Sequence, residues 1–201
     1  MRVATACGAI VGLLTVVGAG CGKTERRFTK ADALRVANVQ PAAPGWTWPR
    51  NPAKPGWSGE SPAPATTDPV LAEFRKATAG LVGVGEAAKE WEDSNKLGHL
   101  DVGVYGSASD AHKAMAPFDR LSRKLGARSG RVTGAGPIDG VGDEAWQLSV
   151  AGNGPQVTYH WRRGNLVVEP HVHCFGHCLA DVDAAARAWV DAIDEAARAD
   201  S

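Results

Sequence analysis

The residues of this sequence that could do chemistry are concentrated in the stretch EPHVHCFGHC, residues 169–178. It contains one glutamate, three histidines and two cysteines: Glu169, His171, His173, Cys174, His177 and Cys178. Imidazole nitrogens, carboxylates and thiolates are the groups that bind zinc or copper in proteins. Two cysteines in an oxidising compartment usually pair with each other instead. The stretch therefore predicts either a metal site or a small disulfide loop.

A hairpin must position the first part of this stretch. The sequence VTYHWRRGNLVVEPHVH, residues 157–173, predicts two strands that meet at a two-residue turn at Gly164 and Asn165. Such a turn places three pairs of side chains opposite each other on the core face, namely Trp161 with Val168, Tyr159 with Pro170, and Val157 with Val172.

The other face of the hairpin receives the polar side chains, because side chains alternate along a strand. His160 then lies across from Glu169, and Thr158 lies across from His171. A zinc or copper site would draw its ligands from this face and the loop beyond it: His160, Glu169, His171, His173 and His177. A solvent-facing sheet surface also collects polar residues without binding a metal, and Pro170 would interrupt the ladder.

The cysteine count favours the disulfide. Cys7 falls in an N-terminal segment that we expect to be removed, and Cys21 is the expected site of lipid attachment, which leaves Cys174 and Cys178. Their spacing differs from the CxxC of a zinc knuckle. A Cys174–Cys178 disulfide is the preferred interpretation, with no cofactor; a metal site and free thiols are the alternatives.

The N-terminus predicts export. Arg2 precedes an almost uncharged run that extends to Gly20, the layout of a secretory signal, and the run is short for a helix that must cross about 30 Å of hydrocarbon. The small residues Gly18 to Gly20 before Cys21 resemble the lipobox of bacterial lipoproteins. That resemblance implies an acylated Cys21 and a chain held at the extracytoplasmic side of the cell membrane. Ordinary signal cleavage and an uncleaved anchor are the alternatives.

The charge balance excludes one class of partner. The chain has 22 Lys and Arg against 22 Asp and Glu, and no basic stripe is present. Because nucleic-acid affinity comes largely from neutralised phosphates, we expect no nucleic-acid partner.

The order of the segments predicts one domain behind a tether. After a signal peptide at 1–20 and a lipidated tether at 21–28, a short helix begins at a capping box of Thr29 and Asp32. It leads into a proline-rich strap that ends at residue 68. The strap carries Trp46, Trp48 and Trp57, which either pack on the domain or form an exposed binding surface.

Residues 69–201 are expected to form an α+β domain. The patterns predict a helix from Pro69, strands, a helix after Ser107 that breaks at Pro117, three strands, and a closing amphipathic helix. Gly130–Gly142 is expected to be a glycine-rich connection. Strands joined by hairpins favour an antiparallel sheet flanked by helices rather than a doubly wound sheet.

No catalytic constellation is recognisable in the sequence. Asp143 and Glu144 are adjacent, so on a strand they point in opposite directions and make a poor acid and base pair. Ser107 and Ser109 precede a helix as caps, and no GxSxG elbow is present. We therefore expect a protein that is not an enzyme.

The motifs GVGDEAWQL and WRRGNLVV, followed by an alanine-rich helix, resemble a group of actinobacterial cell-envelope lipoproteins and the extracellular sensor domains of some mycobacterial serine/threonine kinases. The resemblance covers roughly residues 98–199. It implies a Mog1/PsbP-like fold, an antiparallel sheet flanked by helices. It also implies binding of a small ligand or an envelope protein without catalysis.

Overall fold

The computed structural model describes residues 27–40, 56–57, 67–78, 83–93, 95–152, 154–176 and 182–199. These residues contain five helices: α1 (Lys30–Ala37), α2 (Pro69–Thr78), α3 (Ala108–Met115), α4 (Phe118–Ser129) and α5 (Val182–Arg198). The same residues contain seven strands: β1 (Gly56–Trp57), β2 (Gly83–Asp93), β3 (Lys96–Tyr105), β4 (Arg131–Pro137), β5 (Glu144–Ala151), β6 (Gln156–Arg163) and β7 (Leu166–Cys174).

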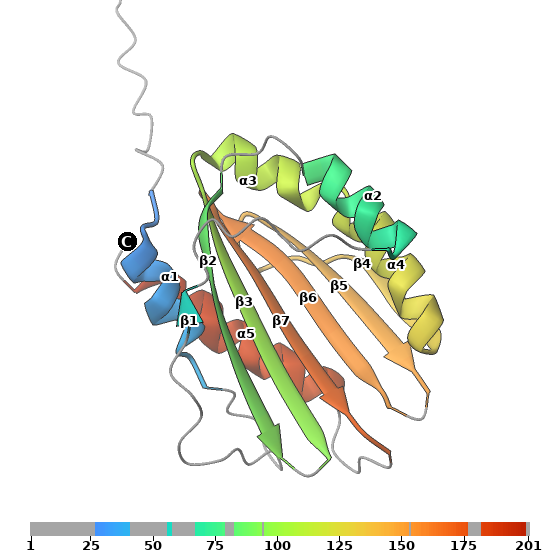
Figure 1. Cartoon of the computed structure of the whole chain (residues 1–201). Helices are drawn as coiled ribbons and strands as arrows, with labels where there is room; N and C mark the ends of the chain where they lie inside the picture. The colour runs from blue at the N-terminus through green and yellow to red at the C-terminus, as the bar shows by residue number, and fades with distance from the viewer. Residues whose placement is uncertain are drawn as a thin grey trace, which may run out of the picture.

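The described strands form one antiparallel sheet in the order β1-β2-β3-β7-β6-β5-β4. Helices α1 and α5 lie against one face, and α2, α3 and α4 cross one end of the other face (Figure 1). The predicted α+β class, a single domain built on an antiparallel sheet flanked by helices, is confirmed.

The main core lies between the sheet and the helices α1 and α5. Leu100, Val102 and Val104 alternate along β3 and are almost completely buried on this face. Helix α5 presents the predicted apolar stripe to β6 and β7 in the same core, with Ala185, Trp189, Ile193 and Ala197 buried. Burying such side chains is the largest favourable contribution to folding, and it decides which face of each strand is left for polar residues.

The hairpin β6–β7 has the predicted register. Trp161 pairs with Val168 and Val157 pairs with Val172, around a turn in which Gly164 has a φ of 54°. A positive φ at the first central residue is the conformation of a type II′ turn, which glycine adopts without strain. Pro170 does not end β7, because β7 continues to pair with β3 through Leu100 and Pro170.

The expected glycine-rich connection at Gly130–Gly142 is wrong in its first half. Residues Arg131–Pro137 form β4, an edge strand paired with β5, so four strands rather than three lie between α4 and α5. The strand is hard to recognise because most of its side chains are exposed or partly exposed, so its sequence RVTGAGP shows no apolar alternation.

The N-terminal boundary of the domain also lies earlier than expected. Phe28, assigned to the tether from the sequence, is only 2% exposed and belongs to the main core, as do Ala33, Val36 and Ala37 of α1. The buried Asn165 side chain accepts a hydrogen bond from Phe28 N at 2.7 Å and donates to Phe28 O at 3.1 Å. The predicted capping box of Thr29 and Asp32 is present. Part of the strap forms β1, which pairs with β2.

Candidate functional site

A cluster of polar side chains lies on the sheet face opposite the main core. On β3 and β7 the even-numbered side chains are buried in the main core, so the odd-numbered side chains lie on the other face. On β6 the odd-numbered side chains are in the core, so its even-numbered side chains lie on that other face. We call six of these residues the polar grid: His99, Asp101, Thr158, His160, Glu169 and His171.

Strand register arranges the polar grid in two rows. In the first row His99 of β3 is opposite His171 of β7, and His171 is opposite Thr158 of β6. In the second row Asp101 is opposite Glu169. Residues directly opposite on one face of an antiparallel pair have Cβ atoms about 4.5–5.5 Å apart, so the six side chains are close neighbours.

Hydrogen bonds join the polar grid in three pairs. His99 Nε2 lies 2.9 Å from Asp101 Oδ2, and His160 Nδ1 lies 3.0 Å from Glu169 Oε2. Thr158 Oγ1 lies 2.7 Å from His171 Nδ1. Each carboxylate therefore has a histidine partner, and these contacts hold the rings in defined orientations.

The environment of the polar grid favours neutral histidine at His171. Burial lowers the pKa of His171 to about 4, although the charge of Glu169 opposes the shift. Burial also lowers the pKa of His173, the next residue on this face of β7. Burial raises the pKa of Glu169, but the hydrogen bond and charge of His160 outweigh it and the net pKa is lowered. The face thus combines an ionised carboxylate with an uncharged imidazole.

One end of this face is covered by helices. Phe118, the first residue of α4, stacks on the His160 ring with centroids 3.9 Å apart. A small apolar cluster of Ala111, Met115 and Val167 fills the space under α3, with Tyr105 and Trp146 against it. His160 is 4% exposed, and its Nε2 atom has no hydrogen-bond partner in the structure. His160 therefore marks the boundary between the covered and open parts of the face.

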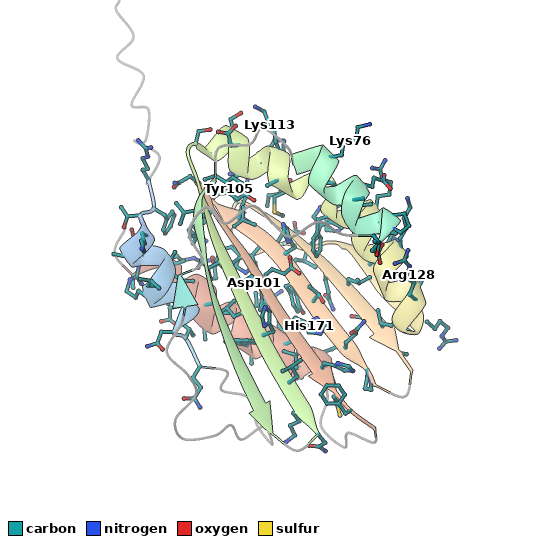
Figure 2. The ribbon with its side chains drawn as sticks, in the orientation of Figure 1. Lys76, Asp101, Tyr105, Lys113, Arg128 and His171 are labelled. Carbon is teal, nitrogen blue, oxygen red and sulfur yellow. The ribbon has the colours of Figure 1, made fainter. Side chains whose placement is uncertain are left out.

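The other part of the face is open to solvent at its acidic residues. Figure 2 shows Asp101 and His171 on the region of the sheet away from α2, α3 and α4, whereas Tyr105 lies beside α3. The side chains of Asp101 and Glu169 are 30% and 37% exposed. Phe175 directly follows the last residue of β7 and is 48% exposed. The centroid of its ring lies 4.2 Å from the centroid of the His173 ring.

A separate ion-pair network lies where α3 meets the sheet. Glu144 Oε2 lies 2.7 Å from His112 Nδ1 and 3.0 Å from Arg162 Nε. Burial raises the pKa of Glu144, but these two partners outweigh it, and the net pKa is lowered. Asp143 Oδ2 accepts a hydrogen bond from Gly164 N at 2.7 Å, so this acid holds the β6–β7 turn.

The structure brings four of the predicted site residues together on one face: His160, Glu169, His171 and His173. Cys174 points to the opposite side, where it is fully buried in the main core, and it is disulfide-bonded. Its predicted partner Cys178 lies outside the described residues, as does His177, so the pairing of Cys174 with Cys178 stays a prediction. In the part of the chain that the structure describes, no group of three or more His, Cys, Asp or Glu residues is arranged to hold a metal ion.

Three further predicted residues, Cys21, Trp46 and Trp48, also lie outside the described residues. Trp57 forms β1 with Gly56, at the edge of the sheet next to β2. Lipidation of Cys21 and a binding role for the tryptophans stay predictions.

Sequence reasoning missed two members of the polar grid. His99 and Asp101 were not singled out from the sequence as site residues. The local signal was present, since His99 and Asp101 are two residues apart and therefore share a face. Their role depends on β3 lying next to β7, a pairing of segments about 70 residues apart that no local pattern specifies.

None of the described helices is both long enough and apolar enough to cross a membrane.

No known protein family and no curated protein matches the sequence. The fold is similar to the crystal structure of the extracellular domain of PknH from Mycobacterium tuberculosis, with a TM-score of 0.45 and 12% sequence identity. The match covers 84% of this chain and 93% of that chain.

Proposed function

We propose that this chain is a non-enzymatic, sensor-like binding protein of the cell envelope, and that its binding surface is the open part of the sheet face around the polar grid. The proposal rests mainly on one observation, namely that helices cover only one end of this sheet face. Helices close one end of it over His160, and Asp101 and His171 lie beyond them. Binding sites place a few oriented polar groups beside apolar surface, and here the exposed ring of Phe175, next to His173, supplies the apolar part.

The proposed location rests on the sequence. A secretory signal followed by small residues and Cys21 supports export and acylation, and two acyl chains on one cysteine make a stable anchor. The resemblance of GVGDEAWQL and WRRGNLVV to motifs of cell-envelope lipoproteins and extracellular sensor domains supports the same location. The partners we propose are the membrane, through the lipid, and a small ligand or an envelope protein.

Replacing Cys21 with serine is expected to release the protein from membranes, because the anchor would lose the only atom to which the lipid is attached. Fractionation of cells that produce the wild type and the Cys21→Ser variant measures this, with Cys7→Ser as the matched control that stays in the membrane fraction. If the Cys21→Ser variant still sediments with membranes as the wild type does, the lipid anchor is wrong.

A thermal-shift screen of small polar compounds tests the binding role. A compound present at 100 times its Kd is expected to stabilise the fold by about 2.7 kcal/mol, a rise in Tm of roughly 5–10 °C. The double variant Glu169→Gln, His171→Gln should lose most of that rise. Glu195→Gln, which changes an exposed acid on α5, should keep it. If the double variant keeps the full rise in Tm, the compound binds at another surface.

The alternative function is binding of zinc or copper by His160, Glu169, His171, His173 and His177. The contact between Glu169 and His160 Nδ1 favours it, because it leaves His160 Nε2 without a hydrogen-bond partner. Histidines that bind metal ions commonly have one nitrogen oriented by a carboxylate in this way. Against it, Cys174 is disulfide-bonded and has no thiolate to offer. A chelator should leave the Tm unchanged under the main proposal and lower it under this one.

A further inference from the structure

The helices that cross one end of the sheet carry an excess of positive charge. Helices α2, α3 and α4 together contain seven lysines and arginines against three acids, whereas α5 on the opposite face contains two against four. The net charges of these two sides are therefore +4 and −2, although the charges of the whole chain balance. The excess is assembled from three helices that pack beside one another.

The cations of this helical layer are more exposed than its acids. Four ion pairs join the two kinds of side chain, and they are Lys113 with Asp110, Arg120 and Lys124 with Glu73, and Arg128 with Asp68. In these pairs the cationic side chains are 47–63% exposed and the acidic ones 20–36%. The outermost charges of the layer are therefore positive.

Two further exposed cations, Lys76 of α2 and Arg123 of α4, belong to the same layer. Figure 2 shows Lys76 and Lys113 on the side of α2 and α3 that faces away from the sheet. We call the six cations the basic face: Lys76, Lys113, Arg120, Arg123, Lys124 and Arg128.

The chain leads toward Cys21 from the same end of the sheet. The Asn165 side chain donates hydrogen bonds to Phe28 O at 3.1 Å and to Tyr105 O at 2.8 Å. Tyr105 is the last residue of β3, and α3 begins three residues later. Phe28 therefore lies beside the end of the sheet that α3 crosses (Figure 1).

The distance from Phe28 to the expected lipid is short. Cys21 precedes Phe28 by seven residues, so even a fully extended chain keeps the two within about 25 Å of each other. A lipid on Cys21 would thus hold this end of the domain, with its basic helices, close to a bilayer. Attraction between exposed cations and anionic headgroups acts over about 10 Å, so it operates in an anchored domain.

We propose that the basic face lies on the membrane that holds the anchor, with its lysines and arginines against anionic phospholipid headgroups. The inference rests on the proposed function, because it requires the anchor at Cys21. In this orientation the open part of the polar grid lies beyond α2, α3 and α4, away from the lipid, and stays accessible to a ligand.

Chemical modification of lysines in the anchored protein tests this orientation. The full protein, purified from membranes with its own anchor, is reconstituted into vesicles of phosphatidylcholine alone or with about 30% anionic phosphatidylglycerol. A water-soluble acetylating reagent is added, and mass spectrometry gives the reaction rate of each lysine. Lys76, Lys113 and Lys124 are expected to react about tenfold more slowly on the anionic vesicles. Lys96, at the other end of β3, should react equally on both.

Two arginine variants and added salt show whether charge causes the protection. Arg120→Gln should make the protection about fivefold smaller, because one exposed cation is lost from the basic face. Arg187→Gln removes an arginine from an exposed ion pair on α5 and should leave the protection unchanged. Both variants are first checked for a wild-type Tm. Salt should abolish the protection, since it screens exposed charges.

The outcomes separate the inference from the proposed function. Equal lysine reactivity on both kinds of vesicle, in a protein that floats with them, overturns the orientation and leaves the anchor in place. A protein that does not float with phosphatidylcholine vesicles lacks the anchor, which overturns the proposed anchoring and this inference together. Protection that rises with the number of protein molecules per vesicle indicates contact with a second copy rather than with lipid, and it also overturns the inference.

Discussion

Replacing Asp194 with alanine is expected to lower the free energy of unfolding by about 3–5 kcal/mol. Asp194 lies on α5 with only 3% of its surface exposed. Its carboxylate accepts hydrogen bonds from Arg163 Nη2 at 2.7 Å and from Gly142 N at 3.2 Å, and it also pairs with Arg198. One buried acid therefore ties the closing helix to the end of β6 and to the loop before β5. Its loss leaves the Arg163 guanidinium, which is mostly buried, without a counter-charge.

The same helix provides the matched control for this prediction. Asp191 lies one turn earlier, is 56% exposed and pairs with Arg187 at 3.0 Å. Exposed pairs of this kind contribute little, so Asp191→Ala should cost no more than about 0.5 kcal/mol. Urea unfolding of both variants measures the two values. Equal costs for the two variants would mean that the buried network around Asp194 does not hold α5 on the sheet.

Acid is expected to destabilise the fold through His171. Its pKa is about 4 in the folded chain and 6.5 ordinarily, so between these values the unfolded chain takes up a proton that the folded chain does not. The free energy of unfolding therefore falls as the pH is lowered from about 6.5 to about 4, by about 2–3 kcal/mol for this residue. His173, whose pKa is also lowered by burial, acts in the same direction.

The variant His171→Gln separates this effect from general acid denaturation. Glutamine does not titrate, so the variant should lose about 2–3 kcal/mol less than the wild type between neutral pH and pH 4. Glu169 acts in a lower range, because its lowered pKa gives stability that is lost only below its ordinary value of 4.5. An identical pH profile for His171→Gln and the wild type would contradict a neutral, half-buried His171 ring.

Local patterns predicted the elements whose signals are contained within a few residues. The β6–β7 register follows from one glycine turn and from alternation on both arms, and the stripe of α5 follows from spacing at helical intervals. Ser107 caps α3, as expected, and the break at Pro117 separates α3 from α4. These features depend on neighbouring residues, which the sequence displays directly.

The features that were missed depend on contacts between distant segments. Strand β4 has little apolar side-chain signal and exists because β5 provides a partner for its backbone. The part of the chain around Phe28 was assigned to the tether because its burial depends on Asn165, 137 residues away. In the same way, Asp101 gains its significance only when β3 pairs with β7 and places it opposite Glu169. The part of the candidate site on β6 and β7 could therefore be predicted from the hairpin pattern. The part on β3 became visible only in the structure.

The most direct test of the binding surface is to map where the stabilising compounds from the thermal-shift screen bind, by amide chemical shifts of the full chain. We expect the largest shifts in β3, β6 and β7 around the polar grid, with Glu169 and His171 among the residues affected. Shifts confined to α1 and α5, on the opposite side of the sheet, would show that the polar grid is a structural surface and not the binding site.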